Sequence, residues 1–364
     1  MKKVLIVTIQ ENKNYGNRLQ NYALQFVLEQ MGYQVENLMP KKEDVPSLIQ
    51  RLKHFLKRVL FLFGQKKYGI SISNYHRRTR LIAFTNEHIH GKRYLDRGQL
   101  ADTDWSDLAW AVAGSDQIWH NWNWKEIPNE LLFYYLDFIE ETKRISYAPS
   151  FGFSAFPEED IEEHRRGLMG MRALSCREQE GCDLIYELTG RTAQKVLDPT
   201  LLLSAEKWEA IEKKPRFRTP ENYLLLFFLG EKTDEYRMEI QRIADLRGLT
   251  VLDVTDANDP KHFGISPNEF IWLIHHADTV CTDSFHASVF SITFERNLRV
   301  FKRKQARFED MFGRLRDLLE PMGLLSLVYG VGDRIDTALS SEANAYLAEE
   351  RKRSIRYLEE SLNP

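Results

Sequence analysis

Long apolar runs and paired cysteines are missing from this sequence of 364 residues. No stretch of about 18 or more apolar residues occurs, so no segment is predicted to span a membrane. The apolar run in MKKVLIVTIQEN is too short for a signal-peptide core and is predicted to form a first β-strand. The three cysteines, Cys176, Cys182 and Cys281, share no CxxC or Cys/His spacing. This pattern argues against disulfides or a zinc site and favours reduced, buried thiols in a cytoplasmic protein.

Acidic residues are missing from one long segment, 45–86, which carries nine lysines and arginines and no Asp or Glu. The whole chain has a net charge of −3, so the remainder is clearly acidic. Apolar residues of the segment recur at helical spacing, with cations between them: Leu48, Leu52, Phe55, Val59 and Leu62. Such a helix suits an anionic membrane surface, or its apolar stripe packs on the N-terminal domain. Nucleic acid is not expected, because no reader motif accompanies the charge.

What the sequence does contain is an alternation of strand-like and helix-like segments, which restarts after a polar, proline-bearing stretch at 212–222. The alternation predicts an α/β protein with two Rossmann-like domains around a cleft, 1–211 and 223–340, joined by that stretch as a linker. The basic segment is then a helical insertion in the first domain. The charged tail, 341–364, is predicted to form a helix that crosses back onto the first domain.

Ligands in open α/β sheets bind outside the carboxyl ends of strands, so the loop after the first strand should face the cleft. In IQENKNYGNRLQ this loop places Asn14, Tyr15 and Asn17 at the mouth of a helix, as candidates for acceptor binding. GxGxxG spacing is absent there, so a dinucleotide site is not supported. The alternative is that Gly16 only permits a tight turn, with Asn17 as the helix cap.

A second strand end, AVAGSDQIWHNWNW, is followed by an acid and several tryptophans. Indole faces stack on sugar rings and a carboxylate accepts sugar hydroxyls, so Asp116 and Trp119 are candidates for saccharide binding. Asp116 is the stronger candidate. The alternative is an aromatic loop that covers a core.

Arg177, in LSCREQEG, follows a strand-like stretch and precedes a helix, which would aim its guanidinium into the cleft. There it could bind a carboxylate or a phosphate in bidentate fashion. The alternative is an ion pair with one of the two glutamates that follow.

The stretch TVCTDSFHASVFSIT, residues 279–293, reads as strand, loop and helix, with Asp283 or Ser284 as the N-cap. His286 then lies in the first helical turn, where free N–H groups and the helix dipole favour an anion. We therefore expect a phosphorylated donor near Asp283, Ser284 and His286. Arg307, in FKRKQARFED, is a further candidate for clamping the anion. The alternative is a capped, structural histidine.

Six segments resemble, in this order, the polysaccharide pyruvyl transferase family: NYGNRLQNYAL, AGSDQIW, SCRE, DPTLLL, SPNEFIWLIHHAD and TDSFHASVFSI. The resemblance implies a GT-B-like fold, no metal and no cofactor. It implies phosphoenolpyruvate as co-substrate and a cyclic pyruvate ketal on a sugar of capsule, exopolysaccharide or cell wall, or on its lipid-linked precursor. Carried over by motif, His286 and Arg177 are the catalytic candidates. The alternatives are a GT-B glycosyltransferase that uses a nucleotide sugar and a non-catalytic glycan-binding member.

Overall fold

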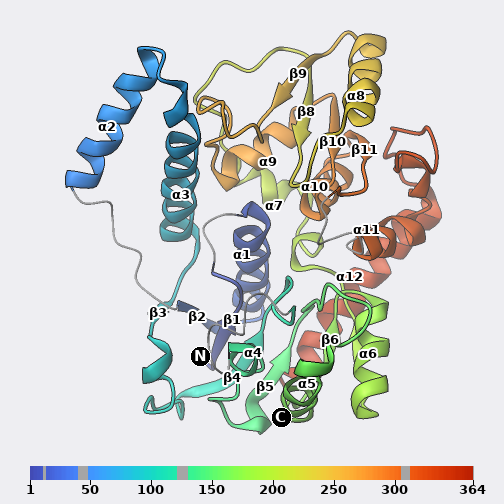
Figure 1. The fold of residues 1–364 in the computed structure, drawn as a ribbon. Coiled ribbons are helices and arrows are strands. Elements are labelled where there is room, and N and C mark those ends of the chain that lie inside the picture. Colours follow the sequence, from blue (N-terminus) through green and yellow to red (C-terminus); the bar gives the residue numbers. More distant parts are fainter. Residues whose placement is uncertain (11–13, 40–47, 121–129, 305–311, 364) are drawn as a thin grey trace.

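Two parallel β-sheets, each accompanied by helices, form the framework of the protein (Figure 1). The computed structural model describes residues 1–10, 14–39, 48–120, 130–304 and 312–363. In Figure 1 the sheet built from the N-terminal half lies below the sheet built from the C-terminal half. The last helix runs from beside the upper sheet down to the lower one.

The first sheet has the strand order β3-β2-β1-β4-β5, and the second has the order β11-β10-β8-β9. The strands of the first sheet are β1 (Lys3–Val7), β2 (Gln34–Met39), β3 (Lys92–Tyr94), β4 (Leu108–Ala113) and β5 (Arg144–Ser146). Those of the second are β8 (Tyr223–Phe227), β9 (Thr250–Asp253), β10 (Thr279–Thr282) and β11 (Asn297–Val300). A short pair, β6 (Ser175–Cys176) and β7 (Gln194–Lys195), forms a third, two-stranded sheet. All the recorded pairings are parallel, which explains why the central strands are apolar and buried on both faces.

Helices connect the strands and cover the sheets. Their bounds are α1 (Tyr15–Gln30), α2 (Leu48–Leu62), α3 (Gly69–His88), α4 (Glu130–Tyr134), α5 (Ile161–Met169), α6 (Gln179–Thr189), α7 (Ala205–Glu209), α8 (Asp234–Arg247), α9 (Pro267–His275), α10 (Phe285–Thr293), α11 (Phe312–Leu319) and α12 (Ser341–Ser361). Local signals explain several helix starts. The Ser266 side chain accepts from the Glu269 N–H while the Glu269 carboxylate accepts from the Ser266 N–H, which is a capping box at α9.

The helices α12 and α3 tie together parts of the chain that are far apart in sequence. From α12, the Tyr357 hydroxyl donates to the Ser146 carbonyl at 2.8 Å, next to β5. On the other side of the molecule, α3 contacts segments around the second sheet. Its Ser73 hydroxyl donates to the Ala257 carbonyl, after β9, at 2.7 Å, and its Arg80 pairs with Glu269 of α9.

The predicted α/β class with two parallel sheets and the returning terminal helix are confirmed by these sheets and contacts. The three cysteines are free and buried, as expected. Among the described helices, none has the length and apolar character needed to cross a bilayer.

The docking of α12 gives a stability prediction. Leu358 in this helix is fully buried, so Leu358→Ala should lower the free energy of unfolding by about 2–5 kcal/mol. The exposed neighbour Glu360 provides the matched control, and Glu360→Ala should stay within about 0.5 kcal/mol of the parent. Urea unfolding measures both. Equal stability of the two variants would contradict docking of α12.

Candidate functional site

The carboxyl ends of β1 and β4 adjoin at the point where the first sheet reverses its strand order, which is the usual ligand position in such sheets. Here the Thr8 hydroxyl donates to the Ser115 carbonyl at 2.9 Å. Asp116, the next residue, is buried and has a φ of 76°, a left-handed conformation that is uncommon outside glycine. Backbone strain of this kind concentrates at functional sites.

Asp198 is the centre of a buried polar cluster beside this strand end. It caps the short helix Pro199–Leu201, where its Oδ1 accepts from the Thr200 N–H at 2.9 Å and from the Thr200 hydroxyl at 2.6 Å. Proline directly after the cap is pre-organised for a helix start, so the DPT sequence fixes this carboxylate locally. Its second oxygen, Oδ2, accepts from the Ser115 hydroxyl at 3.1 Å.

Arg177 follows β6 and is held between two carboxylates. Its Nη1 donates to Asp198 Oδ2 at 2.9 Å and its Nε donates to Glu178 Oε1 at 2.8 Å. The ion pair with a following glutamate is therefore present. Nη2 is buried without a hydrogen-bond partner among the described residues, so it keeps a donor free for a ligand.

His286 reaches the same carboxylate from the second sheet. It is the second residue of α10, which follows β10 and is capped by the Ser284 side chain through the Ala287 N–H. Of the two predicted N-caps, Asp283 and Ser284, the structure confirms Ser284. His286 Nε2 lies 3.7 Å from Asp198 Oδ2 and, among described residues, has no hydrogen-bond partner. Asp198 therefore faces side chains that belong to the two different sheets.

Gly16 in the first turn of α1 makes room for the imidazole. A Cβ built on Gly16 would lie 2.1 Å from His286 Nδ1, so any side chain there would collide with the ring. The Asn14 side chain caps α1 by accepting from the Gly16 N–H at 3.0 Å. The NYG sequence is thus explained by a tertiary contact as well as by the helix start, and Asn14, not Asn17, is the cap.

Asp283 is occupied by contacts within its own sheet. Its two carboxylate oxygens accept from the N–H groups of Leu229 and Gly230, each at 2.7 Å, and Arg303 pairs with it at 3.3 Å. These bonds join the carboxyl ends of β8 and β10. The geometry gives Asp283 a positioning role, and direct contact with a donor stays a prediction.

The candidates for acceptor binding differ in their contacts. Asn17 is buried, and its Oδ1 has no hydrogen-bond partner among the described residues. The Tyr15 ring packs against both Phe227 and Phe270.

Trp119 is fully buried against Tyr135 and Phe151 and offers no ring face to a sugar. The geometry of Trp119 agrees with the alternative, an aromatic residue that covers a core. Stacking of Trp119 on a sugar stays a prediction without geometric support. Arg307 and the other tryptophans of that loop, 122 and 124, lie outside the described residues.

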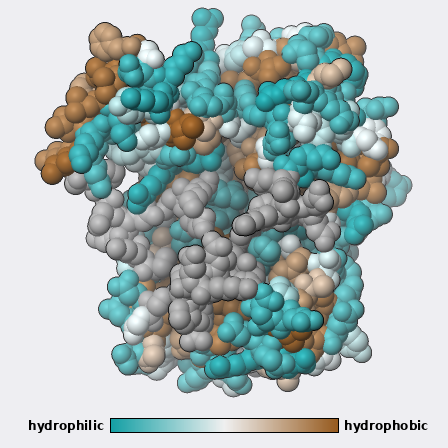
Figure 2. All heavy atoms as spheres, viewed as in Figure 1, coloured by the Kyte–Doolittle hydropathy of each residue, from teal (hydrophilic) through white to brown (hydrophobic). Residues whose placement is uncertain are grey.

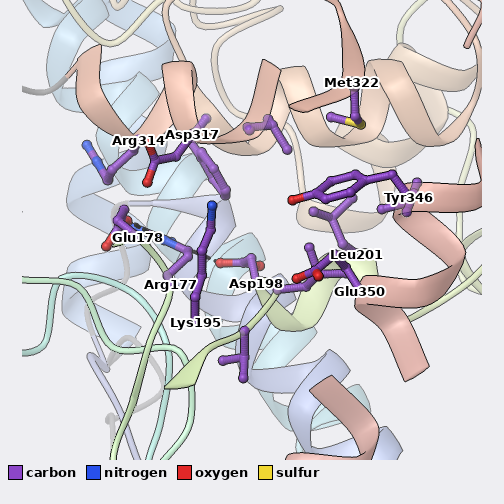
Figure 3. A pocket seen from close by; sticks show the side chains of 15 residues that line it. Arg177, Glu178, Lys195, Asp198, Leu201, Arg314, Asp317, Met322, Tyr346 and Glu350 are labelled. Atoms are coloured by element: carbon purple, nitrogen blue, oxygen red, sulfur yellow. Dashed lines mark hydrogen bonds and ion pairs between the residues drawn. The ribbon is translucent and has the colours of Figure 1, made fainter. Parts of the chain in front are cut away.

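A small hollow borders the cluster on the side of α11 and α12 (Figure 3). The side chain of Lys195 extends into it, Arg314 and Asp317 lie above, and Tyr346 closes the other side. Its volume of about 30 Å³ is that of roughly one water molecule.

The charges of the cluster are set by burial and by one another. Burial lowers the pKa of His286, as do Arg177 and Arg314, and Asp198 and Asp116 offset this only in part. Burial opposes ionisation of Asp198, but His286, Arg177 and the bonds from Thr200 outweigh it and lower its pKa. At neutral pH we therefore expect a neutral imidazole beside an ionised carboxylate.

Sequence reasoning missed two members of the site, Asp198 and Arg314. Asp198 lay in the quoted DPTLLL segment, where an acid before proline signals a helix cap. Arg314, in α11, has its pKa lowered to about 10, first by burial and then by Arg177. Nothing in its local sequence indicates that it approaches Arg177.

One group among the described residues has ligand atoms close enough for a metal ion, namely Glu212, His275 and His276. His275 Nδ1 already lies 2.9 Å from Glu212 Oε2, and His276 Nδ1 lies 3.0 Å from the Trp272 carbonyl oxygen. None of the three belongs to the Asp198 cluster.

Comparison with known proteins adds family and fold. Residues 14–304 match a family described as polysaccharide pyruvyl transferase. None of the curated proteins matches the sequence. A Listeria monocytogenes structure assigned as a UDP-N-acetylglucosamine 2-epimerase is similar with a TM-score of 0.51 and 11% identity, over 97% of this chain and 96% of that one. A Neisseria meningitidis UDP-GlcNAc 2-epimerase is similar with a TM-score of 0.47 and 10% identity, over 100% and 99%. At such identities the likeness shows the fold alone.

The contact between Gly16 and His286 gives a second stability prediction. Gly16→Ala should lower the free energy of unfolding by about 1–3 kcal/mol, because the added methyl group forces the imidazole or a helix to move. Gly98→Ala is the control, since a Cβ there meets nothing within 4 Å. Urea unfolding compares the two. Equal effects would mean that the ring does not pack against Gly16.

The lowered pKa of His286 gives a pH prediction. Between its folded pKa and about 6.5, the unfolded chain binds this proton more readily than the folded protein, so acidification through this window costs stability. His286→Gln should therefore lose less stability than the parent between pH 7.5 and pH 5.5. The exposed His276→Gln variant should behave like the parent. Identical losses in the parent and His286→Gln would contradict the lowered pKa.

Proposed function

The chain belongs to the polysaccharide pyruvyl transferase family, and on this basis we propose that it forms a cyclic pyruvate ketal on a sugar, with phosphoenolpyruvate as donor. The acceptor is a surface polysaccharide, such as capsule, exopolysaccharide or cell-wall glycan, or its lipid-linked precursor. We expect the reaction to occur in the cytoplasm.

One observation carries the proposal: Arg177 and His286 meet at the Asp198 carboxylate, where each keeps a buried nitrogen without a hydrogen-bond partner among the described residues. Phosphoenolpyruvate carries phosphate and carboxylate oxygens, which can form hydrogen bonds with these two nitrogens. Fixed, desolvated groups of this kind stabilise charge more strongly than groups in water.

The reaction requires proton movement at defined atoms. A sugar hydroxyl adds to the central carbon of phosphoenolpyruvate and gives up its proton, while the methylene carbon gains a proton and becomes a methyl group. The bond from the central carbon to the phosphate oxygen then breaks, inorganic phosphate leaves, and the second hydroxyl closes the ring and gives its proton to the departing phosphate. One residue that both gives and takes protons near neutral pH suits these steps, and we assign this role to His286.

Asp198 raises the pKa of His286 and so opposes the effect of burial. In the free protein the imidazole is expected to be neutral, so it starts as a proton acceptor. A bound trianionic or dianionic donor adds negative charge beside the ring, which raises the pKa of His286 and lets it take up a proton. Arg177 neutralises the donor, with Ser284 and Arg307 as further donor contacts. Asn14, Tyr15, Asn17 and Asp116 are proposed for the acceptor side.

The test is release of phosphate from phosphoenolpyruvate with a panel of glycan acceptors. The parent should release phosphate only when a suitable glycan is present, with a ketal formed in equal amount. His286→Ala should lower the rate by about 10²–10⁴-fold, because a positioned acid/base contributes that much. His276→Ala, on an exposed histidine of the same half, is the matched control and should keep the parent rate.

Three outcomes would count against the proposal. A rate for His286→Ala within about threefold of the parent would remove its acid/base role. Calorimetry that detects binding of a nucleotide sugar but not of phosphoenolpyruvate would favour a glycosyltransferase. Glycan binding without any phosphate release from phosphoenolpyruvate would favour a non-catalytic member.

A further inference from the structure

Helix α2 exposes a broad apolar surface to solvent. Seven of its large apolar side chains are between 42% and 82% exposed, namely Leu48, Ile49, Leu52, Phe55, Leu56, Leu60 and Leu62. Phe63, directly after the helix, is also 82% exposed. In Figure 1 the helix projects from the body of the molecule, and Figure 2 shows its hydrophobic colouring along the upper left edge. We call this surface the α2 apolar face.

The side of α2 that packs on the protein is mainly the polar one. His54 stacks on Tyr75 of α3 with ring centroids 3.8 Å apart, and its Nε2 lies 3.3 Å from His76 Nε2. Lys57 donates to the Ser71 hydroxyl at 2.8 Å. A surface helix normally turns its apolar stripe towards the core, and α2 does the reverse. The expectation that this stripe packs on the N-terminal domain is therefore wrong for this structure.

Cations border the α2 apolar face. At 3.6 residues per turn, Arg51 and Arg58 fall on one flank of the face and Lys53 on the other, and all three are exposed. Lys66 and Lys67 follow, also exposed. The sequence has no Asp or Glu from 45 to 86, so no acid of this segment neutralises them.

We propose that α2 lies flat on a membrane that contains anionic phospholipids, with the α2 apolar face in the boundary between headgroups and acyl chains. Apolar side chains on one face with cations along its flanks are the pattern of interfacial helices. The long cationic side chains reach up to lipid phosphates while their stems cover apolar surface. At 15 residues α2 is roughly 22 Å long, less than the ~30 Å of a bilayer's apolar core, which favours the flat orientation.

A second copy of this chain is a poorer occupant of the same surface. A two-fold dimer through α2 would bring the flanks of two identical helices together, and these flanks carry cations without acids. Like charges set against each other oppose such pairing, whereas anionic headgroups match them.

The membrane-facing helix is connected to the candidate site. From α3, on which α2 packs, the Arg77 guanidinium lies over the Phe263 ring at 3.7 Å and over the Tyr15 ring at 5.5 Å. Tyr15 and Gly16 belong to the first turn of α1, where Gly16 contacts His286. Docking through α2 would therefore hold the site at a set position relative to the lipid surface. This placement does not depend on which reaction the site carries out.

Vesicle flotation of the full chain tests the proposal. At low salt the parent should float with vesicles of phosphatidylcholine mixed with phosphatidylglycerol, and much less with phosphatidylcholine alone. The double variant Leu52→Glu/Phe55→Glu should reduce binding on the order of tenfold or more, because two apolar side chains that would enter the lipid boundary become charged. Arg51→Glu/Lys53→Glu should remove the preference for anionic vesicles.

The matched control places the same charges on another exposed helix. Met238 and Leu246 of α8 are each 74% exposed, so Met238→Glu/Leu246→Glu should float like the parent. The urea transitions of all variants should match that of the parent, since the changed side chains are exposed. Pyruvyl transfer to a soluble acceptor should be unchanged in the α2 variants, which separates this test from that of the proposed reaction.

Three results would overturn the proposal. The first is a parent that stays unbound with anionic vesicles at low salt. The second is equal flotation of the parent and Leu52→Glu/Phe55→Glu. The third is self-association of the parent in sedimentation, removed by Leu52→Glu/Phe55→Glu, with no vesicle binding, which would assign the α2 apolar face to a second copy of the chain.

Discussion

The buried Asp198 carboxylate is the interaction on which the arrangement of the site depends. One oxygen is fixed by Thr200, and the other meets Ser115 and Arg177 and faces His286. A buried carboxylate is costly unless paired, and Arg177 would be equally costly without it. The need to satisfy these charges therefore brings Arg177, the end of β4 and the start of α10 to one point. The two sheets contribute to a single cluster through this residue.

The strand order of each sheet explains why the cluster forms where it does. In both sheets the strand order reverses beside the first strand of the sheet. The reversal lies between β1 and β4 in the first sheet and between β8 and β10 in the second. Asp116 follows the first reversal, and Asp283 bridges the second by accepting from Leu229 and Gly230. Helices α1 and α10 begin at these points, and Gly16 allows their first turns to meet around His286. The fold thus brings together two strand ends of the kind at which ligands usually bind in open α/β sheets.

Helix α2 obeys a different constraint. Its exposed apolar residues do not pack into the core of either sheet. Its polar side contacts α3 through His54 and Lys57. The family resemblance, carried by six short segments, contained no information on this helix, because none of those segments lies between 45 and 86. The candidate site and the surface features of α2 are therefore separable, although α3 joins them physically.

Local features were readable from the sequence alone. The alternation of segments determined two parallel sheets, the helix cap could be narrowed to Asp283 or Ser284, and the acid-free segment could be read directly, because each depends on neighbouring residues. Only the tertiary structure decided that Asp198 joins Arg177 to His286, that Trp119 is core and that the α2 apolar face is uncovered. Periodicity identifies which residues share a face, but what covers that face depends on contacts between residues far apart in the chain.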